Sequence, residues 1–304
     1  MSSLSSVILA AGLGTGMNSN KPKAVHEVCF TPIIKLVYSA ALEAGANDII
    51  TVIGSKSEQI INCLGEDKNY AYQEQPLGTG HAVMSAMPQL EDGGTLLVLS
   101  GDVPLVTAKT LKAAIKYHFD NRLAATVITA NLPNPTGYGR ILRDENLNVQ
   151  AIIEDKDATA VQKQITEVNS GMYCFDIGLL RAALSDLKND NSQSEYYLTD
   201  TIAILLENGY SVGAYRAADP SEIRGVNNRV QLAAADKAMR KKINERLMLS
   251  GVTMIDPSST YIGTEVEIGC DTVIYPNTTI KGKTKIGSGC EIVSSVIDSS
   301  IRFS

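Results

Sequence analysis

The segment Leu9–Lys23 reads LAAGLGTGMNSNKPK, and it decides how the first part of this chain folds. The apolar run that leads into it, Val7 to Leu9, is typical of a buried strand. Three glycines follow at alternate positions: Gly12, Gly14 and Gly16. A turn without side chains lets backbone N–H groups approach a ligand closely, and such groups bind anions. With the positive charge of Lys23 close behind, the segment predicts a phosphate-binding loop.

The composition excludes several classes of protein. With 304 residues and 44% hydrophobic content, the chain is long enough for two domains with buried cores. A net charge of −6 and a pI near 5.2 argue against a general nucleic-acid surface. No apolar run approaches the roughly 20 residues of a membrane span, and the N-terminus lacks a signal-peptide pattern. We therefore expect a cytoplasmic protein without a nucleic-acid or membrane partner.

Five cysteines are scattered along the chain: Cys29, Cys63, Cys174, Cys270 and Cys290. No two of them form a C-x-x-C pair, so we expect reduced thiols rather than disulfides or structural zinc and assign them no role.

Strand-like and helical segments alternate as far as about residue 226. Apolar strands are expected at VILAA from Val7, at IITVIG from Ile49, at residues 95–99 and at residues 125–130. Helical segments lie between them, including the run Ala108 to His118. This alternation predicts a Rossmann-like α/β fold with a mostly parallel sheet that helices cover on both faces. Ligands are then expected beyond the carboxyl ends of the strands.

One long charged helix is expected from Asn228 to Leu249. Its apolar residues recur at spacings of three and four: Leu232, Ala235, Met239, Ile243 and Leu247. We interpret residues 228–250 as an arm between a first domain, residues 1–227, and a last domain, residues 251–304.

Beyond Asp256, isoleucine recurs every six residues. The positions are Ile262, Ile268, Ile274, Ile280, Ile286 and Ile292, and glycine directly follows three of them. This period is the signature of a parallel β-helix, whereas a β-hairpin meander would show alternation of period two. The repeat stops at Ser304 without the polar cap of most solenoids. We interpret this as a fragment of a longer protein or as an edge that a partner covers.

Two further motifs hold candidate ligands. Residues 73–81 read QEQPLGTGH, and residues 100–105 read SGDVPL directly after the apolar strand TLLVL. An acidic residue at the carboxyl end of a central strand suits Mg²⁺, so Asp102 is a candidate metal ligand. The alternative is that Asp102 caps a helix or a turn. The glycine loop alone also leaves open a dinucleotide-binding fold or a turn that binds nothing.

Seven motifs in a fixed order resemble one family. They are LAAGLGTGM followed by PK, QxxxLGTGH, GDVPL, GYGRI, VNSGMY, EYYLTD and GVNNR, between residues 9 and 229. The order is similar to that of the bacterial N-acetylglucosamine-1-phosphate uridyltransferase family, whose members usually carry a second, glucosamine-1-phosphate acetyltransferase domain. The linking helix and the repeat extend the match to about residue 300. The resemblance implies an α/β nucleotidyltransferase domain and the start of a left-handed parallel β-helix, truncated after its first hexapeptide repeats.

The resemblance also implies an activity. Members of the family join UTP and N-acetylglucosamine 1-phosphate into UDP-N-acetylglucosamine and pyrophosphate with Mg²⁺, a step in peptidoglycan and cell wall synthesis. The nucleotide would contact Leu9, Ala10, Ala11, Gly12, Gly14, Lys23, Gln73, Gly78 and Thr79. Gln73 would read the uracil edge because a carboxamide offers both a donor and an acceptor, and Gln75 is the competing candidate. Asp102 and Asn227 would bind Mg²⁺, with phosphates and water completing its shell.

A sugar site is implied at six further positions. These are Gly139, Glu154, Asn169, Tyr196, Tyr197 and Thr199, and Asn227 would contact the substrate as well. For Glu154 the alternative is a surface ion pair with Lys156. For the two tyrosines the alternative is packing in the core or at the rim of the site.

The implied reaction needs no protein nucleophile, because an oxygen of the sugar phosphate attacks the α-phosphorus of UTP directly. The three histidines, His26, His81 and His118, therefore need no catalytic role, although His81 could order the loop after Thr79. The catalytic positions carried over from the family are Lys23, Asp102 and Gly16.

Gly16 is a departure from the family, which characteristically places an arginine there. Glycine lacks the charge and the fork that hold a triphosphate. We therefore expect weakened turnover unless Lys21 or Lys23 compensates. The run FTPII at residues 30–34 also departs from the GKPM-like run of the family.

Three interpretations of function stay open. The first is a uridylyltransferase with weakened turnover, and the retained Lys23, Asp102, Glu154, Asn169 and Asn227 favour it. The second is a non-catalytic nucleotide-sugar binder or hexapeptide assembly module, and the third is a related sugar-nucleotide pyrophosphorylase. Since acetyl-CoA binds along later coils in the family, we expect no acetyltransferase activity here. A homotrimer through the coils is compatible with the threefold packing common among such repeats.

Overall fold

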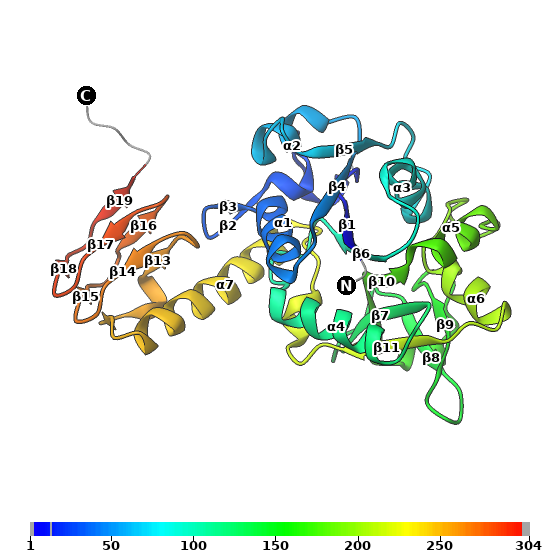
Figure 1. Ribbon diagram of the computed structural model, residues 1–304. Coiled ribbons are helices and arrows are strands. Elements are labelled where there is room, and N and C mark those ends of the chain that lie inside the picture. Colours follow the sequence, from blue (N-terminus) through cyan, green and yellow to red (C-terminus); the bar gives the residue numbers. More distant parts are fainter. Residues whose placement is uncertain (1–2, 13, 300–304) are drawn as a thin grey trace. The chain divides into compact units, whose positions relative to one another are not determined.

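The first strand of the chain is buried on both faces. Residues Ser5 to Ile8 of β1 (Leu4–Leu9) are buried, and β1 lies inside a nine-stranded sheet. Figure 1 shows the computed structural model, which describes residues 3–12 and 14–299. Its contacts divide the chain into two units. The first is Met1–Val25 with Ile34–Gly225, and the second is His26–Ile33 with Val226–Ser304.

The sheet of the first unit is parallel except for one strand on its main path. The order is β11-β7-β10-β6-β1-β4-β5, and β8 and β9 form a hairpin attached to β10. The remaining strands are β4 (Asp48–Ile53), β5 (Asn69–Tyr72), β6 (Thr95–Ser100), β7 (Ala125–Asn131), β8 (Arg140–Arg143), β9 (Val149–Ile153), β10 (Glu167–Asp176) and β11 (Val212–Arg216). Only β10 is antiparallel to its neighbours β6 and β7. The mostly parallel sheet is confirmed, and the reversed strand β10 is an addition that no sequence pattern indicated.

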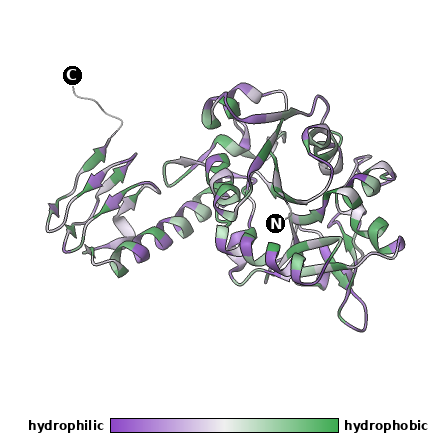
Figure 2. Cartoon of the chain, viewed as in Figure 1, coloured by the Kyte–Doolittle hydropathy of each residue, from purple (hydrophilic) through white to green (hydrophobic). Residues whose placement is uncertain are grey.

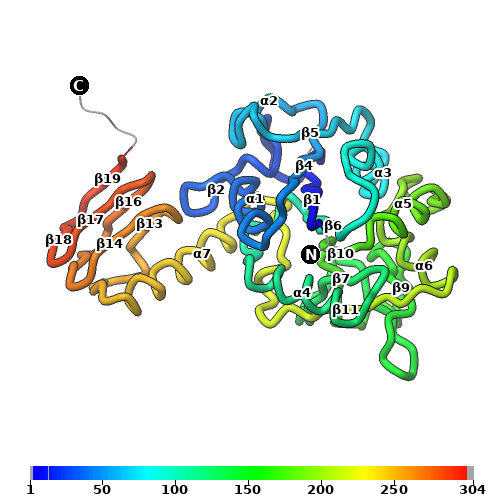
Figure 3. The backbone as a smooth tube through the Cα atoms, viewed as in Figure 1, coloured from blue at the N-terminus to red at the C-terminus, as the bar shows by residue number. Residues whose placement is uncertain are grey.

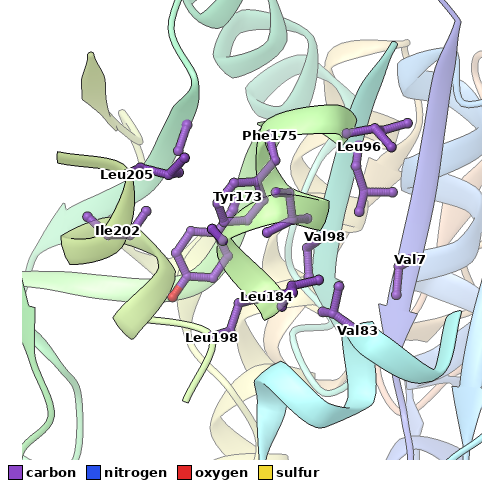
Figure 4. Close-up of a cluster of buried hydrophobic side chains, with 14 of the residues drawn as sticks. Val7, Val83, Leu96, Val98, Tyr173, Phe175, Leu184, Leu198, Ile202 and Leu205 are labelled. Carbon is purple, nitrogen blue, oxygen red and sulfur yellow. The ribbon is translucent and has the colours of Figure 1, made fainter. Parts of the chain in front are cut away.

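Helices cover both faces of this sheet. They are α1 (Ile33–Ala44), α2 (Ser57–Leu64), α3 (Thr79–Ala86), α4 (Ala108–Asp120), α5 (Ile177–Ser185) and α6 (Asp200–Glu207). Leu96 and Val98 of β6 belong to a buried cluster with residues of α3, α5 and α6, as Figure 4 shows. Leu97 and Leu99 point to the opposite face and are also fully buried. This explains why the run TLLVL shows no alternation, as expected for a strand covered on both sides.

A tight hairpin joins β8 to β9. The Asp144 Oδ1 accepts hydrogen bonds from the backbone N–H groups of Asn146 and Asn148 at 2.9 and 2.8 Å. Leu147 then adopts a φ of 67°, a left-handed conformation that costs an L-residue with a Cβ about 1–2 kcal/mol. The side chain of Leu147 is 73% exposed, so little apolar burial offsets this strain.

Leu147→Gly is expected to stabilise the protein by about 0.5–1 kcal/mol, because glycine adopts this conformation without strain. The free energy of unfolding in urea measures the effect. Leu147→Ala is the matched control, since it removes the same exposed side chain but keeps the Cβ. Equal stability of the two variants would contradict the explanation.

The second unit contains the long helix α7 (Arg229–Leu249). The Asn228 Oδ1 accepts from the Gln231 N–H at 2.9 Å and caps the start of the helix. Figure 2 shows hydrophilic and hydrophobic stretches alternating along α7, and its buried residues are Ala235, Ile243, Asn244 and Leu247. In the described parts of the chain, no helix is long and apolar enough to cross a membrane.

Short parallel strands follow α7 and stack in three columns. They are β12 (Thr253–Met254), β13 (Tyr261–Ile262), β14 (Glu267–Ile268), β15 (Val273–Ile274), β16 (Thr279–Lys281), β17 (Lys285–Ile286), β18 (Glu291–Ile292) and β19 (Val296–Asp298). Ile262 pairs with Ile280, and Ile268 pairs with Ile286, so these coils take 18 residues. The pairs Thr253–Val273 and Ile280–Ile297 give coils of 20 and 17 residues at the two ends of the repeat. Three hexapeptides therefore make one turn with three faces. The expected start of a parallel β-helix is confirmed, while the division into domains at residues 227 and 250 stays a prediction.

Residues 26–33 belong to the second unit although they follow the phosphate-loop segment in the chain. They form the hairpin of β2 (Glu27–Val28) and β3 (Thr31–Pro32), which Figure 3 traces beside α7. The Cys29 N–H donates to Asp236 Oδ1 at 2.8 Å. Burial, with the nearby Asp236 carboxylate, raises the pKa of the Cys29 thiol to about 12, which agrees with a structural rather than a reactive cysteine.

Candidate functional site

The carboxyl ends of parallel strands meet at one edge of the sheet, where the sequence predicts ligands. The Gly101 N–H donates to the Leu9 carbonyl oxygen at 2.9 Å, which joins the ends of β6 and β1. The Gln73 N–H donates to the Ile53 carbonyl oxygen at 2.9 Å, which joins the residue after β5 to the end of β4. These bonds extend the ladders one residue beyond the strands. The loops after β1, β5 and β6 therefore open at the same edge.

A cavity of about 280 Å³ lies between these loops. It is lined by Leu9, Ala10, Ala11, Gly12, Lys23, Ala24, Gln73, Pro76, Gly78, Thr79, Ala82, Ser100, Gly101, Asp102 and Glu195. We call it the strand-end cavity. Every residue predicted to contact a nucleotide lines it except Gly14. That glycine packs against Lys23, since a Cβ at position 14 would lie 2.8 Å from the Lys23 Cβ.

The carboxamide of Gln73 is fixed by two hydrogen bonds. Its Nε2 donates to the Gly78 carbonyl oxygen at 3.0 Å and contacts His81 Nδ1 at 3.1 Å. Because a carbonyl oxygen only accepts, the Gly78 contact identifies the nitrogen side of the amide. His81 then accepts at Nδ1 as a neutral ring, so the Gln73 oxygen is the group left to accept from a ligand. Gln75 is exposed and does not line the cavity.

The entry to α3 packs tightly against the segment that contains Tyr196. The Gly80 N–H donates to the Tyr196 carbonyl oxygen at 2.8 Å. A Cβ at Gly78 would lie 2.6 Å from the same oxygen, and Gly78 has a φ of 107°. Both the space and the backbone conformation therefore require glycine at position 78.

Gly78→Ala is expected to destabilise the protein by at least about 2 kcal/mol, because it adds a backbone clash to a strained φ. Gly12→Ala is the matched control on the same cavity wall. A Cβ at position 12 meets nothing within 4 Å, so its cost should stay below about 0.5 kcal/mol. Urea unfolding of the two variants measures the difference, and similar losses would show that the packing at Gly78 is not tight.

The charged groups of the cavity suit a divalent metal ion that takes one carboxylate from the protein and most of its other oxygens from phosphate and water. The Lys23 Nζ forms an ion pair with Asp102 Oδ2, and each side chain is 20% exposed. Gly225 leaves room beside this carboxylate, because a Cβ there would lie 3.3 Å from Asp102 Oδ2. Within residues 3–12 and 14–299, no three His, Cys, Asp or Glu side chains form a metal cage. One carboxylate with open space fits Mg²⁺, which usually keeps water and takes phosphate oxygens.

Asn227, the other predicted metal ligand, lies in the second unit directly before α7. It is exposed, and its backbone N–H donates to Gln231 Oε1 at 2.7 Å. Its pairing with Asp102 stays a prediction.

Gly16 lies in the short 3-10 turn η1 (Thr15–Met17) and is exposed. Helical dihedral angles suit any L-residue, so the backbone at this position accepts a side chain.

Four of the residues predicted for the sugar, Gly139, Glu154, Asn169 and Thr199, lie together with Tyr173 in a second group, which we call the Glu154 cluster. Thr199 Oγ1 donates to Glu154 Oε1 at 3.3 Å, and a Cβ at Gly139 would lie 3.5 Å from Glu154 Oε2. Asn169 Nδ2 donates to the Tyr173 hydroxyl at 2.7 Å. The structure thus brings these predicted residues together and adds the buried Tyr173. That residue ends the motif VNSGMY, but nothing in the sequence distinguished it from core packing.

A β-bulge places the Glu154 cluster beside the strand-end cavity. The pairing of β10 with β7 shifts between Asn169 and Tyr173, and Gly171 in the bulge has a φ of 75°. The Gly171 N–H donates to Asn169 Oδ1 at 3.0 Å, and its carbonyl oxygen accepts from Ser100 Oγ at 3.3 Å. Since Ser100 lines the strand-end cavity, the two groups adjoin at the end of β6.

The two predicted tyrosines differ in their contacts. Tyr196 contributes its backbone to the glycine turn at Gly78, and its ring lies 6.5 Å from that of His81. Tyr197 is buried, and its hydroxyl accepts from Gln193 Nε2 at 2.7 Å. Lys156 contacts Gln193 rather than Glu154, so the alternative of a Glu154–Lys156 ion pair is not present.

The Glu154 carboxyl lies in an environment that disfavours its charge. Burial raises its pKa, the carboxylates of Asp200, Asp157 and Asp155 raise it further, and the hydrogen bond from Thr199 lowers it. Asp155 itself pairs with buried Arg140 at 2.9 Å. This ion pair anchors the end of β9, where Glu154 follows.

Glu154→Gln is expected to raise the thermal midpoint at neutral pH. Because the folded-state pKa is raised, the native protein binds more protons than the unfolded chain, and stability falls as pH rises through and above the ordinary value of 4.5. The neutral amide avoids this loss, so the advantage should vanish below that pH. Glu74→Gln, a change at an exposed glutamate, controls for charge. A stabilisation that does not depend on pH would contradict the assignment.

Comparison with known proteins agrees with this geometry. The profile of the nucleotidyl transferase family matches residues 5–220. The bifunctional protein GlmU of Caldanaerobacter subterraneus subsp. tengcongensis is 52% identical over 303 residues, which cover 99% of this chain and 66% of that protein. GlmU of Acetivibrio thermocellus is 51% identical over 309 residues, with 99% and 67% covered. The chain belongs to the GlmU group of nucleotidyl transferases. The resemblance drawn from the seven motifs is thereby confirmed for the family.

The fold has a solved counterpart. The structure described as UDP-glucose pyrophosphorylase complexed with UDP-glucose superposes with a TM-score of 0.64, covering 80% of this chain and 100% of that one. At 18% identity this similarity shows the fold alone. The chain spans about two thirds of the length of the GlmU relatives, and nucleotidyl transferases of this family typically use a divalent metal ion.

Proposed function

We propose that this chain transfers UMP from UTP to N-acetylglucosamine 1-phosphate and releases UDP-N-acetylglucosamine and pyrophosphate. The observation that carries the proposal is the meeting of the glycine loop, Gln73 and the Lys23–Asp102 pair in one cavity that adjoins the Glu154 cluster. The choice of substrates rests on the family and on the chemistry of these groups.

The hydrogen bonds of Gln73 support uracil as the base. Its amide nitrogen is engaged by Gly78 and His81, so its oxygen can accept from the N3–H of uracil. Cytosine carries a lone pair rather than a hydrogen at N3 and would meet this oxygen with repulsion.

The phosphates would lie against the backbone of the glycine loop and the ammonium of Lys23. Exposed backbone N–H groups and one cation together offset the charge of a triphosphate. A magnesium ion held by Asp102 would supply further neutralisation of phosphate charge.

The Glu154 cluster supports a polar sugar as the second substrate. The carboxylate of Glu154 accepts hydrogen bonds, and sugar hydroxyls donate them. Gly139 keeps the approach to this carboxylate free of a side chain. Since burial disfavours the charged form of Glu154, hydrogen bonds from sugar hydroxyls would stabilise that form.

The chemistry follows from positioning. A phosphate oxygen of the sugar phosphate attacks the α-phosphorus of UTP, the new P–O bond forms, and the bond to the β-phosphate breaks with pyrophosphate as the leaving group. No covalent intermediate with the protein is needed, and the cations offset the charge that builds on pyrophosphate.

Gly16 lowers the rate in this proposal, because a glycine at this position offers no guanidinium fork to the triphosphate. Gly16→Arg is expected to raise kcat/KM by a factor between about 10 and about 150, the range that corresponds to one charge-assisted hydrogen-bond group of 1.5–3 kcal/mol. Pyrophosphate release from UTP and N-acetylglucosamine 1-phosphate with Mg²⁺ measures it.

Thr15→Arg, in the same exposed turn, is the matched control and should not raise the rate. Absence of pyrophosphate release from the wild type and Gly16→Arg alike would refute the transferase. In that case, saturable UTP binding would indicate the non-catalytic nucleotide binder. Equal gains from both arginines would indicate a general charge effect.

A further inference from the structure

Lys23 and Asp102 meet at the wall of the strand-end cavity although 79 residues separate them in the sequence. Lys23 lies in the short 3-10 turn η2 (Lys23–Val25), and Asp102 follows β6. The ammonium contacts Asp102 Oδ2 directly, and both side chains are largely shielded from solvent. Partial burial leaves their attraction less screened than that of a surface pair.

We propose that Lys23 occupies the metal-binding oxygen of Asp102 until a nucleotide arrives, so that the metal ion binds together with the nucleotide and not before it. This inference rests on the nucleotidyl transfer proposed above. It assigns to Lys23 a positioning role in addition to contact with phosphate.

Lys23 and a metal ion compete for the same carboxylate oxygens of Asp102. Asp102 and Glu195 are the carboxylates among the described residues that line the cavity. An ammonium and a divalent ion seek the same oxygen lone pairs, and two cations at one carboxylate repel each other. As long as the ammonium of Lys23 neutralises the Asp102 carboxylate, a metal ion that arrives without nucleotide finds no unpaired charge on that carboxylate. Weak metal binding to the nucleotide-free protein is the consequence.

A triphosphate changes this balance. Its oxygens accept hydrogen bonds from an ammonium, and the flexible four-carbon stem of lysine lets the charge move from the carboxylate to a phosphate. The move releases Asp102 to a metal ion that the same phosphates also bind. Nucleotide and metal therefore bind with positive coupling that runs through Lys23.

Metal binding without nucleotide tests the inference. Mn²⁺ is titrated by calorimetry, with water-proton relaxation as a second measurement. Lys23→Met and the more polar Lys23→Gln should each bind Mn²⁺ at least about 10-fold more tightly than the wild type, because they free the carboxylate. Lys23→Arg keeps a cation on Asp102 and should stay weak. Lys21→Met changes an exposed lysine in the preceding loop and should match the wild type.

The double variant Lys23→Met with Asp102→Asn should lose the increase in Mn²⁺ affinity. This loss would assign the increase to the Asp102 carboxylate. The inference is overturned if folded Lys23→Met and Lys23→Gln bind Mn²⁺ no more tightly than the wild type, or if the double variant keeps the gain.

A second titration adds UTP without sugar phosphate. UTP should tighten Mn²⁺ binding more in the wild type than in Lys23→Met, and equal effects in both would overturn the coupling. Failure of UTP to bind either protein would instead refute the proposed function, while the titration of Mn²⁺ alone still decides the competition at Asp102.

Discussion

The backbone ladder of the parallel strands is the constraint on which the rest of the structure depends. Strands β1, β4, β5 and β6 run side by side, and their hydrogen bonds continue one residue past the strand ends. A loop that leaves any of these strands must therefore open at the same edge. Burial on both faces fixes the register, because a slip by one residue would exchange the residues of the two cores. The packing of the two sheet faces therefore determines where the strands end, and with it the position of the cavity.

Two acidic side chains of the first unit, Glu154 and Asp102, lie where solvent is limited. Burial and the neighbouring carboxylates raise the pKa of Glu154, and Asp102 lies in a cavity where Lys23 pairs with it. In the proposed function a ligand would stabilise both side chains, Glu154 by donating hydroxyl groups and Asp102 by bringing a metal cation. Preorganised charge of this kind trades folding free energy for binding free energy.

The fold could be predicted from the sequence where its signals are local. The six-residue period of isoleucine led to the β-helix, and apolar runs that end in glycine or aspartate led to the strand ends and the cavity. Contacts between distant segments could not be predicted in this way. The reversed strand β10, the bulge that joins Asn169 to Tyr173, and the grouping of residues 26–33 with the second unit depend on tertiary packing. That Gln73 rather than Gln75 lines the cavity likewise depends on the fold, since both side chains have the same chemistry.

The 18-residue coil of the β-helix sets the step by which this part of the molecule can change in length. Removal or addition of 18 residues would leave every later strand on its own face with a comparable neighbour. A change of six would keep the isoleucines inward but turn the remaining chain to the next face. A change of one residue inside a strand would turn the later residues of that strand to the other side. The 17-residue step from Ile280 to Ile297 shows that the loop before β19 can be one residue shorter while the pairing is kept. Added or lost coils are therefore expected to change the gene in multiples of about 54 bases, which is three bases for each of 18 residues, while changes of one or two residues are expected only in the loops between strands.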